Sequence, residues 1–569
     1  MKQLKLLAIL FITFFNAQHV TAQWVWADVL NNGTSGYMNI LSSATDASGN
    51  VYMGGNYYQG ANFGTIYFPV NSQQCFFLTK VDPNGTILWA KHFGGVHGGQ
   101  LTSISTDAAG NVFIAGGFND SALQLGSVTL RNWLPGSFNN NMFIAKLDPS
   151  GNTIWAEDAI ANGVNSIKTD ASGNVIVAGS YQVGAAPTFG TITIPIGLVS
   201  PMFIVKYNSS GSVVWAKSQN YITVPGPPYN ILVTGGLLAT PSARCLTTDA
   251  SGNFFIYGTY SGTFTIGTTT LNSRMGSTDL CLIKYNSAGN VLWAKSIGGT
   301  WGETTNDIAT DASGNVFISG STNSLICGFD GDSVVNFGGC SNGQPFYEQF
   351  IAKYDATGNV LWVNIGRHHC NPVNFIVTDA LGNVYLLVSY PYFPSYYSGG
   401  GSSLTNPYLE KYSPTGTLLW GVHPTELYGA SLAIDATGNL FIMGGFDSVM
   451  LTLNSSFRLI NSTYLKDWYI AKYNGAGNYT PIITNENSKL VLYPNPTSDE
   501  ITIKCNKPED ISTIQIYDML GRQVYDYQPQ AVVDQSINIK LPPTLSDGMY
   551  YLRIMGSNNS GCVRFVVKR

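Results

Sequence analysis

Residues able to bind a ligand or move a proton gather in a few non-repeated segments of this chain. In one of them Arg367 and His368 precede a second histidine, His369. Imidazole titrates near neutral pH, so adjacent histidines can bind a metal or transfer a proton. Neighbouring residues of a strand point to opposite faces, however, and no carboxylate partner is evident. Arg367 and His368 are therefore candidate ligand-binding residues, with a structural role as the alternative.

A second segment, residues 390–401, is rich in aromatic side chains. Tyr392, Phe393, Tyr396 and Tyr397 lie within a few positions of one another and are followed by glycines. Aromatic rings pack on the apolar faces of sugars, and tyrosine adds a hydroxyl group for hydrogen bonding. The segment is a candidate glycan-binding loop, and the alternative is a loop that packs its own rings over the edge of the fold.

Two acidic segments complete the set of candidates. Trp301 and Glu303, with Asp307 close behind, can contact a ligand or cap the structure. Asp330 and Asp332 suggest a calcium loop, but the later acidic ligands of such a loop are missing. The sequence also lacks a Gly-x-Ser-x-Gly elbow centred on serine, a His-Glu-x-x-His motif and a phosphate-binding loop. We therefore predict no metal, no cofactor and no catalytic residue.

The elements that must position these segments are internal repeats. A phrase of the form Asp-Ala-x-Gly-Asn occurs seven times, which indicates a repeat architecture. An aspartate that bonds the backbone ahead of it and a glycine with positive φ are typical of a tight hairpin turn. The seven copies begin at Asp46, Asp107, Asp170, Asp249, Asp311, Asp379 and Asp435.

A second hairpin follows each first one, as in residues 77–91, where a strand bearing Lys80 leads through a turn to a strand bearing Trp89. Two hairpins give four strands, here called A to D. Radially arranged four-stranded sheets are the blades of a propeller, so seven repeats predict a seven-bladed, all-β propeller. We expect the aspartates to form turns, the tryptophans to pack between blades, and the lysines to pair locally or extend to solvent.

The two ends of the repeat region each look incomplete. The seventh repeat lacks its strand-D tryptophan, while an unassigned strand with the Trp-Ala pair, Trp24 to Ala27, stands near the N-terminus. The N-terminal strand is predicted to become strand D of blade seven, which would remove an open sheet edge. A plain N-terminal overhang is the alternative.

Composition and the N-terminus predict an exported protein. Residues 1–22 have a basic start, an apolar segment and small residues at the end, as a signal peptide does. No later apolar run is long enough for a membrane-spanning helix, and the net charge of −5 argues against nucleic acid as a partner. Export permits disulfides, and Cys327 with Cys340, which flank one long loop, is the favoured pair. Cys281 is expected to be a small core residue.

The repeats stop near Tyr479, and residues 490–569 show several short β-type runs that predict a small Ig-like sandwich. The predicted boundaries are 23–482 for the propeller and 483–489 for a linker. The C-terminal part resembles the type A sorting domain of the type IX secretion system. The matching motif residues are Tyr493, Pro494, Asn495, Pro496, Gly521, Arg522, Gly548, Lys568 and Arg569. The resemblance implies passage through the type IX machinery, with release or attachment to surface lipopolysaccharide.

The repeat region itself resembles the SBBP-type propeller repeats of bacterial surface proteins. That family implies a fold and no activity. We expect a secreted or surface-attached module that binds a glycan or a protein, its site on the face with the variable loops or at the channel mouth. The alternative is a propeller enzyme, a lyase or hydrolase, with its site at that mouth. A quinoprotein ranks last, because no quinone site is evident.

Overall fold

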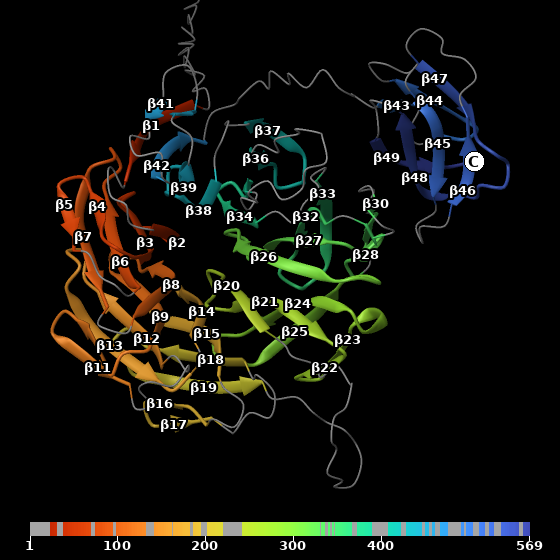
Figure 1. Ribbon diagram of the computed structural model, residues 1–569. Helices are drawn as coiled ribbons and strands as arrows, with labels where there is room; N and C mark the ends of the chain where they lie inside the picture. The colour runs from red at the N-terminus through yellow and green to blue at the C-terminus, as the bar shows by residue number, and fades with distance from the viewer. Residues whose placement is uncertain are drawn as a thin grey trace, which may run out of the picture.

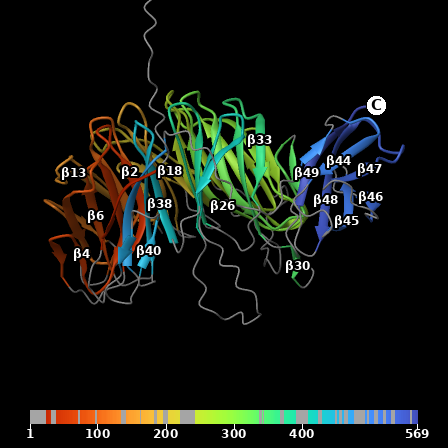
Figure 2. The same cartoon turned by 90° about the horizontal axis from the view of Figure 1, so that it is seen from above.

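Four-stranded antiparallel sheets arranged around a common axis make up most of the computed structural model, and a smaller β domain follows them (Figures 1 and 2). Seven such radial sheets lie within the residues that the structure describes. These are 23–30, 38–69, 74–94, 98–132, 141–161, 163–181, 186–194, 202–219, 242–330, 332–335, 340–341, 344–345, 347–366, 373–389, 408–422, 428–446, 450–453, 458–460 and 467–475, then 491–493, 497–504, 511–517, 523–528, 536–556 and 561–569.

Each sheet runs from an inner strand A to an outer strand D. The first three sheets are β2 (Met38–Thr45), β3 (Val51–Tyr57), β6 (Cys75–Val81) and β7 (Ile87–Phe93); β8 (Gly99–Thr106), β9 (Val112–Phe118), β12 (Asn141–Leu147) and β13 (Thr153–Ala159); β14 (Gly163–Thr169), β15 (Val175–Ser180), β18 (Met202–Tyr207) and β19 (Val213–Gln219). The next three are β20 (Ser242–Thr248), β21 (Phe254–Ser261), β24 (Thr278–Tyr285) and β25 (Val291–Ile297); β26 (Glu303–Thr310), β27 (Val316–Thr322), β32 (Glu348–Tyr354) and β33 (Val360–Ile365); β34 (Val373–Thr378), β35 (Val384–Ser389), β36 (Tyr408–Tyr412) and β37 (Leu418–Val422). The seventh is β38 (Tyr428–Ile434), β39 (Asn439–Phe446), β42 (Asp467–Asn474) and β1 (Gln23–Val29).

Small hairpins stand between strands B and C. Those in the described ranges are β4 (Ala61–Phe63) with β5 (Ile66–Phe68), β10 (Ala122–Leu125) with β11 (Val128–Arg131), β16 (Thr188–Phe189) with β17 (Ile192–Thr193), β22 (Thr263–Ile266) with β23 (Thr269–Asn272), β28 (Ile326–Gly328) with β29 (Ser333–Val335), β30 (Cys340–Ser341) with β31 (Gln344–Pro345), and β40 (Met450–Thr452) with β41 (Arg458–Ile460). A short 3-10 helix, η1 (Arg274–Gly276), follows β23. The all-β class predicted from the sequence is confirmed.

The repeated Asp-Ala-x-Gly-Asn phrase forms the turn between strands A and B. In blade one the Asp46 carboxylate accepts hydrogen bonds from the backbone N–H groups of Ser48 and Asn50, both at 3.0 Å. Gly49 takes a φ of 78°, which a residue with a Cβ adopts only under strain. The second carboxylate oxygen of Asp46 lies 3.3 Å from Nζ of Lys80 on strand C. The lysine thus pairs with the turn of its own blade.

Within the described residues, the lysine and the tryptophan of every blade except the sixth donate to one carbonyl of the next blade. In blade six, of these two side chains only Lys411 reaches blade seven, at the carbonyl of Gly475. Lys80 Nζ and Trp89 Nε1 donate to the same carbonyl, that of Pro149 in the C–D turn of blade two, at 3.3 and 3.1 Å. Blade two repeats the arrangement with Lys146 and Trp155 on Ser209. A buried ammonium needs several acceptors, so each such lysine contacts the A–B turn of its own blade and the C–D turn of the next blade.

The last sheet is completed by the first strand of the chain. β1 pairs antiparallel with β42, and Trp26 stands opposite Lys472. Trp26 Nε1 donates to the carbonyl of Pro83 in blade one at 3.0 Å, and Lys472 Nζ reaches the same oxygen at 3.1 Å. Blade seven therefore contacts blade one through the same pair of side chains that joins each of blades one to five to its neighbour.

The hydrophobic core is divided into layers between neighbouring blades. Between blades one and two, Phe76 stacks on Phe143 with ring centroids 5.0 Å apart, and Ile114 and Leu78 are buried in the same cluster. Fully burying side chains of this size contributes roughly 2 kcal/mol each. The core clusters thus hold adjacent sheets at the spacing that leaves a channel along the axis.

The C-terminal domain has two sheets around a separate core. They are β43 (Val491–Tyr493), β44 (Glu500–Lys504) and β47 (Ser536–Lys540), and β46 (Gln523–Tyr527), β45 (Ile511–Tyr517), β48 (Gly548–Gly556) and β49 (Gly561–Val567). Isoleucines at 501, 503, 514, 516, 537 and 539 fill the space between them. The predicted signal peptide, residues 1–22, and the predicted linker, 483–489, lie outside the described residues.

The favoured disulfide is a correction. Cys327 is a buried free thiol inside the core cluster of blade five, on the β28–β29 hairpin, whereas Cys340 belongs to the separate β30–β31 pair. Within the described residues the loop folds into two hairpins, β28–β29 and β30–β31, and Cys327 is a free thiol on the first of them. Cys281 is buried in the core, as predicted.

Candidate functional site: the central channel

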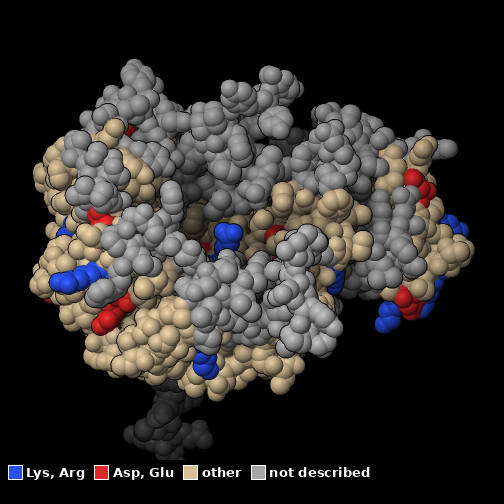
Figure 3. All heavy atoms as spheres, turned by 60° about the horizontal axis from the view of Figure 1, so that its bottom comes forward, with Lys and Arg blue, Asp and Glu red and all other residues tan. Residues whose placement is uncertain are grey.

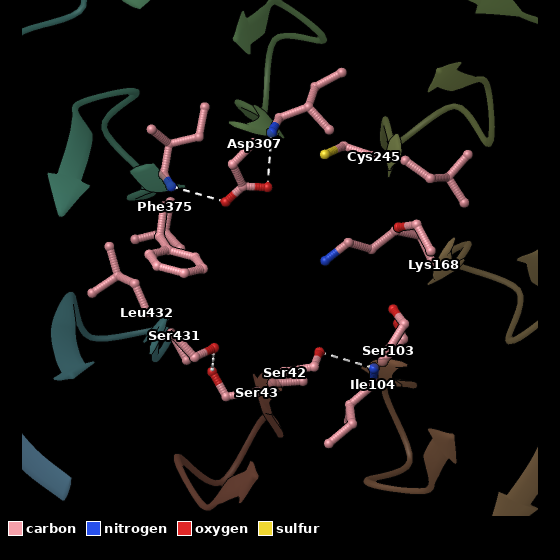
Figure 4. A pocket seen from close by; sticks show the side chains of 18 of the residues that line it. Ser42, Ser43, Ser103, Ile104, Lys168, Cys245, Asp307, Phe375, Ser431 and Leu432 are labelled. Carbon is pink, nitrogen blue, oxygen red and sulfur yellow. Dashed lines mark hydrogen bonds between the residues drawn. The ribbon is translucent and has the colours of Figure 1, made fainter. Parts of the chain in front are cut away.

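The seven inner strands surround a cavity of about 400 Å³ on the propeller axis. Figure 4 shows side chains from all around the ring directed into it. The space-filling view shows a hollow in the middle of one face, with basic and acidic groups near it (Figure 3). A cavity of this size is within the range of small-molecule sites.

A β-bulge in most of the inner strands sets which side chains face the channel. Within the described residues, six of the seven strands A show a register shift, as between Ile40 and Ser42 in β2 or between Thr305 and Asp307 in β26. β34 pairs with β35 without one. A bulge re-aims the side chain that follows it. At this position the blades carry Ser42, Ser103, Ser166, Cys245, Asp307, Phe375 and Ser431.

Three residues further on, threonines link the blades in a ring. The hydroxyl of Thr106 donates to the carbonyl of Thr45 at 2.7 Å, and Thr169 donates to Thr106 at 2.6 Å. The same bond recurs at Thr248, Thr310 and Thr378, and Thr45 donates to the carbonyl of Ile434. Blade seven carries Ile434 in place of a threonine, so it accepts from blade one and has no hydroxyl to give to blade six.

Among the described residues that line the channel, the charged side chains come from three consecutive blades. Lys168 lies on blade three, Arg244 on blade four and Asp307 on blade five, and we call these three residues the charged arc. Lys168 extends toward the middle of the channel (Figure 4). No hydrogen bond or ion pair links the ammonium of Lys168 or the guanidinium of Arg244 to another residue within the described part of the chain.

Asp307 differs from these cations because the backbone holds both of its oxygens. One accepts from the N–H of Ile308 at 2.8 Å, and the other from the N–H of Ile376 in blade six at 2.9 Å. Burial raises the pKa of Asp307 to about 6, although these two hydrogen bonds and the charge of Lys168 act in the opposite direction. The carboxylate thus joins two blades and titrates just below neutral pH.

The opposite wall is formed by hydroxyl groups, and we call Ser42, Ser43, Ser103, Ser105 and Ser431 the hydroxyl arc. Ser42 Oγ accepts from the N–H of Ile104 at 3.0 Å, and Ser103 Oγ accepts from the N–H of Ile167 at 3.1 Å. An oxygen that accepts a backbone proton keeps its own proton to donate. These two serines can therefore donate hydrogen bonds into the cavity.

Blade six contributes an aromatic ring. Phe375 occupies the position that serine holds in four other blades, and its ring faces the channel between the two arcs (Figure 4). Together the walls can bind an anionic group, donate to oxygen atoms and pack against an apolar face. Across the described residues, no group of three or more histidine, cysteine, aspartate or glutamate side chains is placed to hold a metal ion.

Trp301 and Glu303 differ in solvent exposure, although they are only two residues apart. Trp301 is 42% exposed, whereas Glu303 is 2% exposed and begins strand A of blade five. Glu303 accepts a hydrogen bond from Thr322 at 3.0 Å and another from Ser324, whose hydroxyl also contacts the backbone of Trp301. Burial raises the pKa of Glu303 to about 7. These contacts favour a capping role over direct ligand binding.

Several predicted site residues lie outside the described part of the chain. These are Arg367, His368, Tyr392, Phe393, Tyr396 and Tyr397, so their roles stay predictions. Of the sorting motif, Pro494 to Pro496, Gly521 and Arg522 also fall outside it. Tyr493 ends β43 and Gly548 begins β48. The N–H of Lys568 donates to Thr497 at 2.8 Å, and the Arg569 guanidinium donates to the carbonyls of Pro542 and Pro543, both at 2.8 Å.

Sequence reasoning missed Lys168, Arg244, Cys245 and Phe375 as channel residues, and it assigned Asp307 to an acidic loop, whereas Asp307 lies on an inner strand. A signal was present in the repeats themselves. In the last four residues of strands A, serine stands first in four strands, an aliphatic residue second in six and threonine fourth in six, and Cys245, Asp307 and Phe375 are departures from that serine. Aligning the seven strands A by their following aspartates would have singled them out.

Comparison with known proteins supports both parts of the chain. Residues 491–568 match the family described as secretion system C-terminal sorting domain, and residues 292–326 match the family described as beta-propeller repeat, of SBBP type. The chain is a seven-bladed SBBP-repeat propeller with a type IX sorting domain. This sorting domain indicates a secreted protein or one attached to the outer-membrane surface. Among the described residues, no helix has the length and apolar character needed to cross a membrane.

Individual relatives of this SBBP-repeat propeller are distant. An uncharacterized WD repeat-containing protein, L264 of Acanthamoeba polyphaga mimivirus, is 24% identical over 534 residues, which is 75% of this chain and 37% of the viral protein. This chain therefore spans little more than a third of that relative. Among solved structures, the Dos1 propeller gives a TM-score of 0.37 at 8% identity, over 80% of this chain and 97% of that one. A protein of unknown function from Dyadobacter fermentans gives 0.37 at 9%, over 80% and 99%.

Proposed function

We propose that this exported propeller is a binding module that takes a small polar ligand into its central channel. The observation that carries the proposal is the composition of the channel wall. Hydroxyl groups, an aromatic ring and two cations without partners among the described residues converge on one cavity of about 400 Å³. Such a wall suits a ligand with several oxygen atoms, such as part of a glycan. The aromatic loop at residues 390–401 is proposed as a second contact for a longer glycan.

The alternative is an enzyme acting in the same channel, a lyase or a hydrolase. It is favoured by one observation, the pKa of about 6 at Asp307, because a group that titrates near the working pH can transfer protons. Against it, both Asp307 oxygens accept backbone N–H groups, and no histidine lines the cavity within the described residues. Binding without turnover is therefore the function we propose.

The sorting domain sets where the binding occurs. We propose that passage through the type IX machinery presents the propeller outside the cell, either released or attached to surface lipopolysaccharide. Deleting residues 490–569 should leave a folded propeller in the periplasm. Surface display of this truncated chain would refute the sorting role.

A glycan array with the full exported chain tests the channel. Leu41 lies at the cavity wall and is 37% exposed, so Leu41→Trp should narrow the site with little cost to folding. Leu88→Trp makes the same change on an outer strand, where the side chain is 49% exposed, and serves as the control. Binding that falls in the Leu41 variant alone supports the channel. Equal binding by both variants would move the site away from it, with Tyr392/Tyr396/Tyr397→Ala as the next variant.

A further inference from the structure

We infer that the channel ligand is a polyhydroxylated compound with a single negative charge, whose anionic group contacts Lys168 and Arg244 and whose hydroxyl groups contact the hydroxyl arc. This inference rests on the proposed function, because it names the class of ligand for the same channel. It is drawn from the distribution of charge and hydroxyl groups around the wall. Lys168 and Arg244 disfavour neutral ligands, Asp307 disfavours ligands with several negative charges, and the hydroxyl arc disfavours simple inorganic anions.

The cations of the channel require an anionic partner. Lys168 replaces the alanine, serine, threonine or valine that the other six inner strands carry at this position. Its ammonium projects into the cavity, and no hydrogen bond or ion pair connects it with another described residue (Figure 4). The charge of Lys168 lowers the pKa of Asp307, but no direct ion pair joins the two, so a ligand anion can still bind the ammonium and replace the hydration that it loses.

Arg244 adds a second cation to the cavity wall. It is the bulged residue of β20, where the pairing shifts between Ala243 and Cys245, and it is exposed at the cavity wall. Asn165 on blade three donates to the carbonyl of Ala243 at 2.6 Å, which ties the two blades together next to the bulge. A guanidinium can bind a carboxylate through two parallel hydrogen bonds. Lys168 and Arg244 can therefore contact the same anionic group from adjacent blades.

Asp307 limits the charge of the ligand. With its carboxylate ionised, the charged arc carries two positive charges and one negative, so its net charge is +1. A ligand with one negative charge balances this arc, whereas one with two or more would meet repulsion from Asp307. Because Asp307 is fixed by the N–H groups of Ile308 and Ile376, it cannot rotate away from the ligand.

The remainder of the wall selects for hydroxyl groups. Ser42 and Ser103 accept from backbone N–H groups and keep their own protons, which can be donated to ligand oxygens. Ser43 and Ser431 share a hydrogen bond of 2.7 Å across blades one and seven. The Phe375 ring offers an apolar surface next to them, suited to the C–H face of a ring. A simple inorganic anion at Lys168 and Arg244 would leave the hydroxyl protons of Ser42 and Ser103 without a ligand acceptor.

Titration calorimetry on the full exported chain tests the inference with four probes: glucuronate, its neutral methyl ester, glucose 6-sulfate and acetate. We expect the ester and acetate to bind at least about tenfold more weakly than glucuronate. Glucose 6-sulfate separates a sulfate from a carboxylate as the anionic group. Lys168→Met and Arg244→Gln should each reduce glucuronate binding about tenfold and leave ester binding unchanged. Lys295→Met on the outer strand β25 and Arg131→Gln on the β10–β11 hairpin, both away from the channel, are the matched controls.

The outcomes distinguish this inference from the proposed function. Equal affinity for glucuronate and its ester, both lost in Leu41→Trp, would overturn the anionic class and leave channel binding intact. Acetate binding as tightly as glucuronate would overturn the requirement for hydroxyl groups. If no probe binds and the glycan array is also negative, the proposed function fails and this inference fails with it. Loss of glucuronate binding in Lys168→Met with an unchanged melting temperature supports it.

Discussion

Trp26 lies directly opposite Lys472 in the seventh sheet, as Trp89 lies opposite Lys80 in the first. The pairing brings the indole of Trp26 against Gly85 of blade one, where a Cβ would come within 3.1 Å of the ring. Trp26→Ala removes that packing and the bond to Pro83. We expect it to lower the free energy of unfolding by about 2–4 kcal/mol, measured by denaturant titration.

Val25 provides the control for that change. It is the neighbouring residue on the same strand and is 44% exposed. Val25→Ala should alter stability by less than about 0.5 kcal/mol. Similar effects of the two substitutions would show that β1 contributes little to closure of the ring.

The threonine ring predicts that the stability of the propeller depends on the threonine hydroxyl groups and not on the shape of the side chains. Thr310 donates to the carbonyl of Thr248 at 2.7 Å. Thr310→Val keeps the shape of the side chain but loses this bond, which should cost about 1 kcal/mol in thermal unfolding. Thr310→Ser retains the hydroxyl and should retain more of the stability. A valine variant as stable as the wild type would mean that the ring has no energetic role.

The buried lysines should be far more sensitive than surface ones. Lys353 lies 3.2 Å from Asp311, and both side chains are 5% exposed. Lys353→Met leaves the buried carboxylate without its cation and should cost about 3–5 kcal/mol. Lys295→Met removes a cation from the exposed pair with Asp330 and should cost less than about 1 kcal/mol. Comparable melting temperatures for the two variants would contradict this account.

Glu303 predicts a stability that rises on acidification. Its pKa is about 7 in the folded protein and about 4.3 in an unfolded chain, so the folded state binds the extra proton between these values. Stability should therefore increase as pH falls from about 7 to about 4.5, by roughly 2–4 kcal/mol for this group. Glu303→Gln should remove the contribution of this group, leave that of other buried carboxyl groups such as Glu410, and be more stable than the wild type at pH 8. Denaturant midpoints across this range provide the measurement.

Asp307 predicts that ligand binding also changes with pH. Protonation below pH 6 removes the negative charge of the channel, while Lys168 and Arg244 supply its cations and Cys245, whose pKa is raised by burial, stays neutral. Affinity for glucuronate, whose carboxylate remains ionised, should therefore increase from pH 7.5 to 5.5. Asp307→Asn should bind with nearly constant affinity over that range. An affinity that falls on acidification would contradict the assignment of Asp307.

The repeat pattern allowed the blades to be predicted because each turn depends on local chemistry. The bonds from Asp46 to Ser48 and Asn50 lie within five residues, so the sequence alone indicates them. The long-range pairing of β1 with β42 could be predicted for another reason. The seventh repeat lacks its strand-D tryptophan, and the unassigned strand near the N-terminus carries the Trp-Ala pair of a strand D. The predicted disulfide of Cys327 was wrong, because the spacing of two cysteines in the sequence does not tell which way a side chain points inside a hairpin.

The channel could not be predicted in the same way, because its wall is assembled from residues on seven separate strands. Lys168 and Asp307 are far apart in the sequence, and the bulges decide which residue of each strand faces inward. A bulge shifts the alternation of a strand by one residue, so a simple inside–outside pattern places the following side chain on the wrong side. Only the departures from the seven-fold pattern were visible beforehand.

Closure by β1 has a consequence for how the protein is made. β1, which precedes the other strands of the propeller in the chain, belongs to the same sheet as β42, which is synthesised after six complete blades. Blade seven therefore cannot form until nearly the whole propeller has left the ribosome, and a prematurely terminated chain has no partner for its first strand. Such a product keeps open sheet edges that favour aggregation and degradation. The order of the strands therefore means that the propeller closes only after β42 has been synthesised.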